Sequence, residues 1–530
     1  MRLSLTQALI LVLSALLAAC RPEAVVPAQS VATDEEARIY PDYRNVTIPP
    51  NIAPLNLRVR DSLATAFVAE VSGRGGSVTA AARADEALRF DSLEWRRLLL
   101  ASKGSDLSVT LYARHGDAWF RHPDYTMHVA EEEVDPYLAY RLIEPSYELY
   151  RQLGLYQRNL ENFDERVIYE NNRTYSDDDN HCVNCHNFQS HSAGRMLFHV
   201  RARHGGTVFI HDGKAEKVDL RNDSILSGAV YPAWHPVKPW VVFSSNQTGQ
   251  AFHLTDPQKI EVIDYGSDLI FYDVEKNVVR NVLRTDDTFE TFPAFAPDGR
   301  RLFYCSAPAP YGAGLTNAEA RIDSTLAAWD NVRYDILSMP FDPETLTFGP
   351  PSVEVDCRSV NKSASLPRVS PDGRWLLFTL GDFGQFHIWH RSSDLWLKDL
   401  RSGELRPLSE VNSPDVDSYH AWSSNGRWIV VATRRDDGSY TRLYLAYFDR
   451  DGRARKPFLL PQADPEHNLL RMKSYNVPEF SRDAVNVDPE TLRKVIYDDG
   501  AARAVTLGPA VSTTPAAGSA RPVSVKKDAK

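Results

Sequence analysis

Residues 182–186 read Cys-Val-Asn-Cys-His, so a histidine directly follows the second of two closely spaced cysteines. This is the spacing of the c-type haem attachment motif. The two thiols bond to the vinyl groups of the porphyrin, and the imidazole after the second cysteine is held where it can ligate the iron. We therefore predict one covalent haem c, attached through Cys182 and Cys185, with His186 as an axial ligand of the iron.

Two other kinds of site use the same pair of cysteines. A Cys-x-x-Cys segment can be a redox dithiol of the thioredoxin kind or half of a zinc site. The chain contains only five cysteines and no second Cys-x-x-Cys segment, so it cannot complete a four-cysteine zinc site. The histidine after Cys185 favours haem, and a dithiol is the main alternative.

The N-terminal residues have the pattern of an export signal. Arg2 precedes an apolar run, Ala8–Ala19, that is too short to span a bilayer and ends at Leu-Ala-Ala-Cys20. This ending resembles the bacterial lipobox, which implies a lipoprotein signal peptide at 1–19, cleavage before Cys20 and lipid attached to Cys20. An ordinary signal peptide with an incidental cysteine is the alternative. The expected location is the bacterial cell envelope, on the outer membrane, facing the periplasm or the surface; covalent haem attachment in bacteria also takes place outside the cytoplasm.

Composition narrows the remaining possibilities. The chain has 530 residues, of which 43% are hydrophobic and 25% charged, as in ordinary globular proteins of two or three domains. Its net charge is −10, or −11 without residues 1–19, so there is no electrostatic basis for binding nucleic acid. Cys305 and Cys357 are left for a disulfide in an oxidising compartment, with a buried free thiol as the alternative at Cys305.

An internal repeat follows the haem motif. Each unit starts with an aromatic or apolar residue, often followed by proline, and reaches a turn at the same offset. Pro-Asp-Gly and Asn-Gly turns close hairpins because glycine takes the required positive φ. Apolar and alternating strands follow most of these turns, which predicts four-stranded blades of a β-propeller. The units are 231–238, 292–299, 366–373, 419–426 and, in degraded form, 477–484.

A sixth unit adjoins the haem motif. Gly194–Phe198 matches the turn and the second strand of the repeat, so we predict six blades. Too little chain follows Ala484 to complete the last blade, and strands from before the motif, such as Arg166–Tyr169, are expected to close the ring. Counting back seven residues from Gly194 starts the first strand at Asn187. His186 is then expected in the loop at the mouth of the central channel.

The distal side of the iron needs a second candidate ligand. Loops between the second and third strands of each blade are expected at the same mouth, and their histidines are candidates. His204 is the first choice, because its loop belongs to the blade of the haem motif and Gly205-Gly206 lets the backbone turn closely. Met196 has a suitable spacing but lies in an apolar run that indicates core packing. The other candidates are His253, His387, His390 and His420.

The rest of the chain is divided by composition and pattern. Residues 20–45 are rich in Ala, Val, Pro and acids, which predicts a tether. Residues 46–130 alternate apolar and polar residues over short runs, which favours a small β-sandwich with a short helix at Ser92–Ser102. An aromatic face over 131–180 indicates a helical connector, and the propeller is expected over 181–500. Residues 501–530 have no core-forming pattern and are expected to be disordered.

The Pro-Asp-Gly repeats resemble the TolB-like propeller superfamily. Together with the lipobox and the Cys-x-x-Cys-His motif, the chain resembles a group of lipoproteins from Bacteroidetes-type bacteria described as cytochrome c or TolB-like propeller proteins. The most specific stretches are Tyr137–Pro145 and Cys182–Val208. The resemblance implies a mainly β fold, with a six-bladed TolB-like β-propeller after a small β-sandwich and a short helical connector, and it implies haem binding. It implies no substrate, since propellers host unrelated functions.

Two classes of function fit these features. The first is a membrane-anchored monohaem c-type cytochrome that transfers electrons to a redox partner docked on the propeller. The second is a haem enzyme that acts on a small substrate at the channel mouth; a binding propeller with a structural haem is a weaker third. A six-coordinate iron favours electron transfer and an open position favours chemistry. The sequence has no Gly-x-Ser-x-Gly segment, which excludes a propeller-linked serine peptidase.

Overall fold

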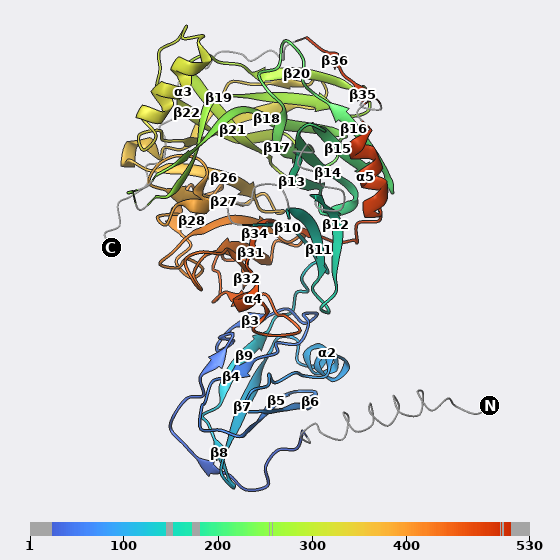
Figure 1. The fold of residues 1–530 in the computed structure, drawn as a ribbon, viewed down its shortest axis with the longest axis vertical. Coiled ribbons are helices and arrows are strands. Elements are labelled where there is room, and N and C mark those ends of the chain that lie inside the picture. Colours follow the sequence, from blue (N-terminus) through green and yellow to red (C-terminus); the bar gives the residue numbers. More distant parts are fainter. Residues whose placement is uncertain are drawn as a thin grey trace, which may run out of the picture. The chain divides into compact units, whose positions relative to one another are not determined.

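The computed structural model describes residues 24–144, 152–171, 181–253, 255–256, 258–498, 500 and 503–509. The predicted signal peptide and Cys20 lie outside these residues. The chain forms two compact units, the first comprising residues up to Val134 together with 160–163 and 456–471, and the second the remainder (Figure 1). No helix in the described residues is long and apolar enough to cross a membrane.

The first unit is built on one large sheet and a helix, where the sequence predicted a two-sheet sandwich. The predicted helix is confirmed as α2 (Ser92–Ala101), which begins where the Asp91 side chain accepts the N–H groups of Leu93 and Glu94 and which buries Trp95, Leu98 and Leu99. The seven-stranded sheet contains β1 (Val31–Ala32), β3 (Thr47–Ile48), β5 (Ala66–Gly73), β6 (Gly76–Arg83), β7 (Ser105–His115), β8 (Ala118–Arg121) and β9 (Tyr125–Val129), and a separate pair contains β2 (Ile39–Tyr40) and β4 (Arg58–Val59).

The predicted tether is partly folded. β1 pairs with β8, β2 pairs with β4, and Ala37 and Tyr43 are buried, so residues 24–45 belong to the first unit. Short strands of two residues carry little periodic signal, which is why composition alone indicated a linker.

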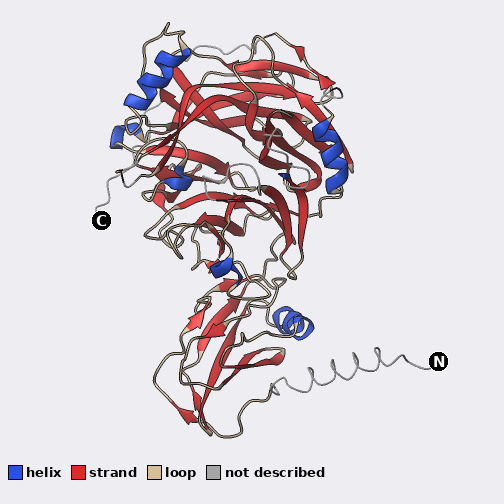
Figure 2. Ribbon diagram, viewed as in Figure 1, coloured by secondary structure: helices blue, strands red, loops and turns tan. Residues whose placement is uncertain are grey.

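The second unit is a six-bladed β-propeller made of antiparallel sheets (Figure 2). The predicted number of blades is confirmed. In chain order the strands of the first five blades are β13 (His181–Gln189), β14 (Ser192–Ala202), β15 (Gly206–His211), β16 (Lys214–Asp219); β17 (Ala229–Trp234), β18 (Trp240–Phe252), β19 (Ile260–Asp273), β20 (Val278–Leu283); β21 (Thr288–Phe295), β22 (Arg301–Pro308), β23 (Asp335–Asp342), β24 (Thr347–Phe348), β25 (Ser352–Val355); β26 (Ser363–Val369), β27 (Trp375–Gly381), β28 (Asp394–Asp399), β29 (Leu405–Pro407); and β30 (Asp417–Trp422), β31 (Trp428–Thr433), β32 (Arg442–Tyr447).

The sixth blade joins the two ends of the propeller. Its inner strand is β34 (Ser474–Ser481), which pairs with β10 (Tyr137–Ile143), followed by β11 (Gly154–Asn159) and β12 (Glu165–Glu170). Strands from before the Cys-x-x-Cys-His segment therefore close the ring as predicted, and Arg166–Tyr169 lies in β12. The predicted helical connector at 131–180 is wrong for the residues described. Residues 138–142 of β10 are all buried, so no alternation was present to reveal a strand.

The chain after the sixth blade packs back onto the propeller. Helix α5 (Pro489–Tyr497) is capped by Asp488 and buries Leu492 and Ile496 in a core formed by the first and sixth blades. β35 (Arg503–Ala504) and β36 (Thr506–Leu507) then extend the outer edges of two blades in parallel with β16 and β20. The prediction of a disordered tail is wrong for these residues, because an unpaired edge strand accepts a partner with little sequence requirement.

Met196, Cys305 and Cys357 are each buried in the propeller. Met196 is fully buried in the hydrophobic core of the first blade, as its apolar surroundings indicated. Cys305, in β22, and Cys357 are both buried as free thiols. Other helices are α3 (Ala318–Ala327) and the 3-10 turns η2 (Arg358–Val360) and η3 (His387–Trp389) in the propeller, and α4 (His467–Leu470) in the first unit.

Candidate functional site

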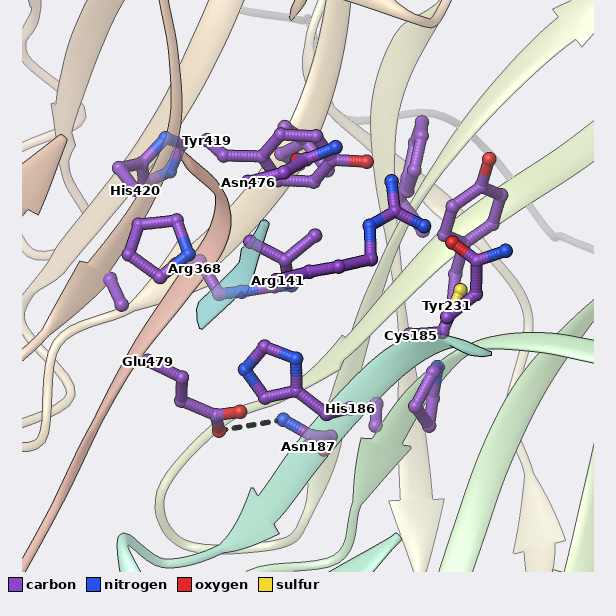
Figure 3. Close-up of a pocket in the computed structure, with 18 of the residues that line it drawn as sticks. Arg141, Cys185, His186, Asn187, Tyr231, Arg368, Tyr419, His420, Asn476 and Glu479 are labelled. Carbon is purple, nitrogen blue, oxygen red and sulfur yellow. Dashed lines mark hydrogen bonds between the residues drawn. The ribbon is translucent and has the colours of Figure 1, made fainter. Parts of the chain in front are cut away.

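A cavity of about 570 Å³ lies at the centre of the propeller, lined by residues from the inner strands of all six blades (Figure 3). Its volume lies within the range of small-molecule and cofactor sites. Cys182, Cys185 and His186 all line it. The structure thus brings the three residues of the motif to one cavity.

One irregularity recurs in the inner strand of every blade and shapes this cavity. The pairing register shifts at the same point of each repeat, and a cavity-lining residue stands at that point. Four of these residues share with Cys185 a positive φ, between 46° and 55°. The six residues are Cys185, Tyr231, Phe292, Leu366, Tyr419 and Val477. Cys185 has the smallest side chain of the six.

The same bulge explains how both cysteines reach the cavity. In a regular strand, residues three apart point to opposite faces of the sheet. The register of β13 on β14 shifts between Asn184 and Asn187, and Cys185 has a φ of 53°. A bulge of this kind re-aims the side chains around it. Cys182 and Cys185 consequently both line the cavity.

The motif lies in a strand and not in the loop that the sequence predicted. β13 begins at His181, six residues before the predicted start at Asn187. The hairpin that follows closes at Ser190 and His191, both with positive φ, while Gly194 lies inside β14. Counting back from Gly194 therefore misplaced the strand, and His186 lines the channel cavity instead of standing in a loop at its mouth.

His186 is buried and its imidazole is without hydrogen bonds. His186 is only 3% exposed, and neither nitrogen of its ring has a hydrogen-bond partner among the described residues. Burial, and secondly the charge of Arg141, lowers the pKa of His186 to about 3. The imidazole is therefore neutral near pH 7, the form in which histidine ligates metals. An orphaned neutral imidazole beside two thiols fits a covalently bound haem.

The thiol of Cys182 is also held within the cavity wall. The Asn184 amide donates to Cys182 Sγ at 3.3 Å, and burial raises the pKa of this thiol. A thiol with a raised pKa is a poor nucleophile at neutral pH. The environment therefore argues against Cys182 as the attacking thiol of a dithiol.

Charged side chains from the first, fourth and sixth blades complete the lining, and the sequence pattern did not reveal them. Arg141 comes from β10, Arg201 from β14 and Arg368 from β26. Glu479 of β34 accepts hydrogen bonds from Asn187 Nδ2 at 2.8 Å and from the Phe188 amide at 3.1 Å, and burial raises its pKa to about 8. The one available signal was an arginine inside the otherwise apolar run 137–143.

His204, the first candidate for the distal ligand, is not among the residues that line the cavity. It packs against Tyr497 of α5 with ring centroids 4.4 Å apart and against His181 at 5.5 Å. The structure does not bring His204 and His186 together in one cavity. The loop after β14 is directed toward α5, because α5 covers the first blade.

Of the other distal candidates, only His420 lines the cavity. Its Nδ1 lies 3.1 Å from the Ser418 carbonyl oxygen and its Nε2 3.3 Å from that of Leu377. His253 stacks on Trp329, and His390 Nε2 lies 2.7 Å from Glu261 Oε2. His191, which the sequence did not single out, also lines the cavity, with its Nδ1 3.3 Å from the Phe480 carbonyl oxygen.

His387, the remaining candidate, predicts a measurable dependence of stability on pH. Its Nδ1 lies 2.8 Å from Ser365 Oγ, and burial lowers its pKa from 6.5 to about 3. The unfolded chain takes up this proton first as the pH falls, so folding loses stability from pH 6.5 toward pH 3. His387→Gln removes that loss. Urea unfolding should show the stability difference between wild type and variant shrinking by about 2 kcal/mol between pH 7.5 and pH 5.

If the stability difference between wild type and His387→Gln stayed constant between pH 7.5 and pH 5, the His387 imidazole would not have a lowered pKa in the folded protein.

Among the described residues, no group of three or more His, Cys, Asp or Glu side chains is arranged to hold a metal ion. Such a group is needed where protein side chains alone hold the metal ion. The iron of a haem already has four porphyrin nitrogens and would need only one imidazole from the motif.

Comparison with known proteins identifies the fold only. No protein-family model matches the sequence, and no curated protein is significantly similar to it. Solved structures similar to the chain include TolB from Acinetobacter baumannii, at 13% identity and a TM-score of 0.39, covering 70% of this chain and 78% of that one. The propeller domain of the Trilobed protease from Pyrococcus furiosus matches at 11% identity and a TM-score of 0.27, covering 80% and 98%.

A prolyl oligopeptidase from Galerina marginata is also similar, at 9% identity and a TM-score of 0.32 over 66% of this chain. The match spans only 42% of that enzyme.

Proposed function

We propose that the protein is an extracytoplasmic monohaem c-type cytochrome that binds one covalent haem c in the propeller channel and passes electrons to a redox partner protein. The observation that carries the proposal is the convergence of Cys182, Cys185 and His186 on one cavity, with both nitrogens of the His186 ring buried and unpartnered. A regular strand would have separated the two cysteines, and the bulge that every blade has at this point places both at the cavity.

Each residue has a defined part in this proposal. Cys182 and Cys185 hold the porphyrin through thioether bonds, and the neutral His186 imidazole ligates the iron. A bound haem would supply one-electron redox chemistry. Aromatic side chains line the cavity, among them Tyr231, Phe292 and Tyr419, and would shield a bound haem from water.

The direct test is covalent attachment. The wild-type chain, made with a haem c maturation system, should keep its haem through a denaturing gel, detected by haem peroxidase stain. The alkaline pyridine spectrum of the denatured chain should be that of a porphyrin with two saturated side chains. A wild-type band without haem would refute the proposal.

A haem enzyme is the alternative, favoured by the distal side of the cavity. Among the described residues that line it there is no methionine, and His191 and His420 both contact backbone carbonyl oxygens. An iron without a protein ligand on that side would bind small molecules. Carbon monoxide binding to the reduced protein at micromolar concentration would favour the enzyme, and a low-spin spectrum unaffected by carbon monoxide would favour electron transfer.

The cell envelope is the proposed location, with a lipid on Cys20 as the membrane anchor. Cys20→Ala should abolish lipid attachment and stop processing by the lipoprotein signal peptidase, because the acylated thiol is lost. Radiolabelled palmitate and the mass of the N-terminal peptide measure this. Cys305→Ala is the control, since Cys305 is buried in a propeller strand. Unlabelled wild-type protein in the soluble periplasmic fraction would contradict the anchor.

A further inference from the structure

Arg141 is a buried cation inside the central cavity. It lies on β10 and is 6% exposed, and Figure 3 shows it among the residues around the cavity. No ion pair or hydrogen bond joins its guanidinium to another residue in the described part of the chain, and its Nε is buried without an acceptor. Arginine stays protonated in proteins, so the charge has to be balanced in another way.

The other buried arginines of the propeller have the polar or acidic partners that Arg141 lacks. Arg442 donates to the Lys473 carbonyl oxygen at 2.7 Å, Arg427 lies 3.7 Å from Asp372, and Arg158 is attracted by Glu165 and Asp164. A buried charge without a counter-charge is strongly destabilising. Arg141 is therefore expected to meet its partner in a group that binds in the cavity.

The charges around Arg141 favour an anion. Arg201 and Arg368 also line the cavity. Of the two carboxyl groups there, Glu144 lies 3.2 Å from Lys473 Nζ, and Glu479 is hydrogen-bonded to β13 with a pKa raised to about 8 by burial. Neither supplies a free negative charge to the arginines at neutral pH.

The uncharged side chains of the lining indicate what kind of molecule carries the anionic group. Its side chains are mainly rings and aliphatic groups, namely Phe188, Tyr231, Trp234, Phe292, Leu366, Phe386 and Tyr419. Such a wall favours a large apolar or aromatic body over a highly charged one. An occupant that fits this lining carries an apolar or aromatic body and an acidic group.

We propose that Arg141 binds a carboxylate of the molecule that occupies the propeller channel. The planar guanidinium matches a carboxylate through two parallel hydrogen bonds. The inference rests on the proposed function where the carboxylate is a propionate of the attached haem. A free aromatic carboxylate has the same chemistry and is the second source that the experiment separates.

The test uses the haem-free chain carrying Cys182→Ala and Cys185→Ala. Protoporphyrin IX, which has both propionates but no iron, is titrated against it and followed by fluorescence, and its dimethyl ester is titrated in parallel. Arg141→Met should weaken binding of the acid about tenfold or more and leave the ester unchanged. Arg195→Met is the matched control, because Arg195 donates to Gln189 Oε1 and does not line the cavity. It should change neither affinity.

Thermal unfolding without any ligand provides the second readout. Arg141→Met should leave the melting temperature unchanged or raise it, because an unpaired buried charge is removed. If Arg141 stabilised the unliganded fold instead, its replacement would lower the melting temperature. Equal weakening of acid and ester, or a lower melting temperature of the unliganded variant, would overturn the inference.

Benzoate separates the two sources of the carboxylate. Stabilisation of the haem-free chain by benzoate, lost in Arg141→Met, with no porphyrin binding, assigns the site to a free carboxylate; the inference then stands although the haem proposal fails. Covalent haem in the wild type together with acid binding that ignores Arg141→Met refutes the inference and leaves the haem proposal intact. Binding of neither compound overturns the inference.

Discussion

Replacing Cys182 and Cys185 with alanine is expected to abolish covalent haem completely, because each thioether bond needs its own thiol and no other cysteine lines the cavity in the described residues. Haem stain on a denaturing gel, normalised to total protein, should fall to background. Each single replacement should leave a weaker band, attached through one bond.

Cys305→Ala and Cys357→Ala are the matched controls for this loss. Both residues are buried thiols of the same propeller and lie outside the cavity lining. The Cys305→Ala and Cys357→Ala variants should stain like the wild type, even though replacing a buried cysteine with the smaller alanine costs some stability. Haem that persists in the double Cys182 and Cys185 variant would show attachment elsewhere.

The propeller was predictable because its repeat carries two independent signals. Turn glycines such as Gly299, Gly373 and Gly426 have positive φ of 66° to 71°, as the Pro-Asp-Gly and Asn-Gly segments predicted. Apolar strands follow each turn at a constant offset. Agreement between turn chemistry and strand pattern makes the assignment of these units secure.

In the first blade, the prediction of strand positions from turn glycines was wrong. Its hairpin closes at Ser190 and His191, which have positive φ without being glycine, so the sequence contains no turn signal there. The nearest glycine, Gly194, was used instead and shifted the register. Aligning Cys185-His186 with the aromatic-proline pairs, such as Tyr231-Pro232 and Phe292-Pro293, gives the register that the structure has. Bulges are set by tertiary pairing, and that signal is weaker than a turn glycine.

The expected placement of His204 was wrong for a related reason. His204 was placed near the haem by its loop type, but the structure packs it against Tyr497. That residue belongs to α5, nearly three hundred positions away along the chain, roughly the whole length of the propeller. Arg141 was likewise hidden, since it reaches the cavity only because β10 joins β34. Contacts between distant segments leave no local periodicity to detect.

Closure of the ring by β34 is expected to be essential for the whole propeller. A chain ending at Arg471 lacks the inner strand of the sixth blade, with its buried Tyr475 and Phe480, and leaves the buried strand β10 with an unpaired edge. We expect this variant to lose cooperative thermal unfolding, measured by circular dichroism, and to be degraded rapidly by trypsin at protease levels that leave the wild type intact.

A chain ending at Asp498 is the matched control, because it keeps β34 and α5 and removes only β35 and β36 at the outer edges. Each of these edge strands has two residues, so the loss should lower the melting temperature by only about 2 °C. Cooperative unfolding of the shorter chain would mean that five blades fold without closure. Since the cavity walls come from all six inner strands, the shorter chain should also lose the site, and with it covalent haem in the gel assay.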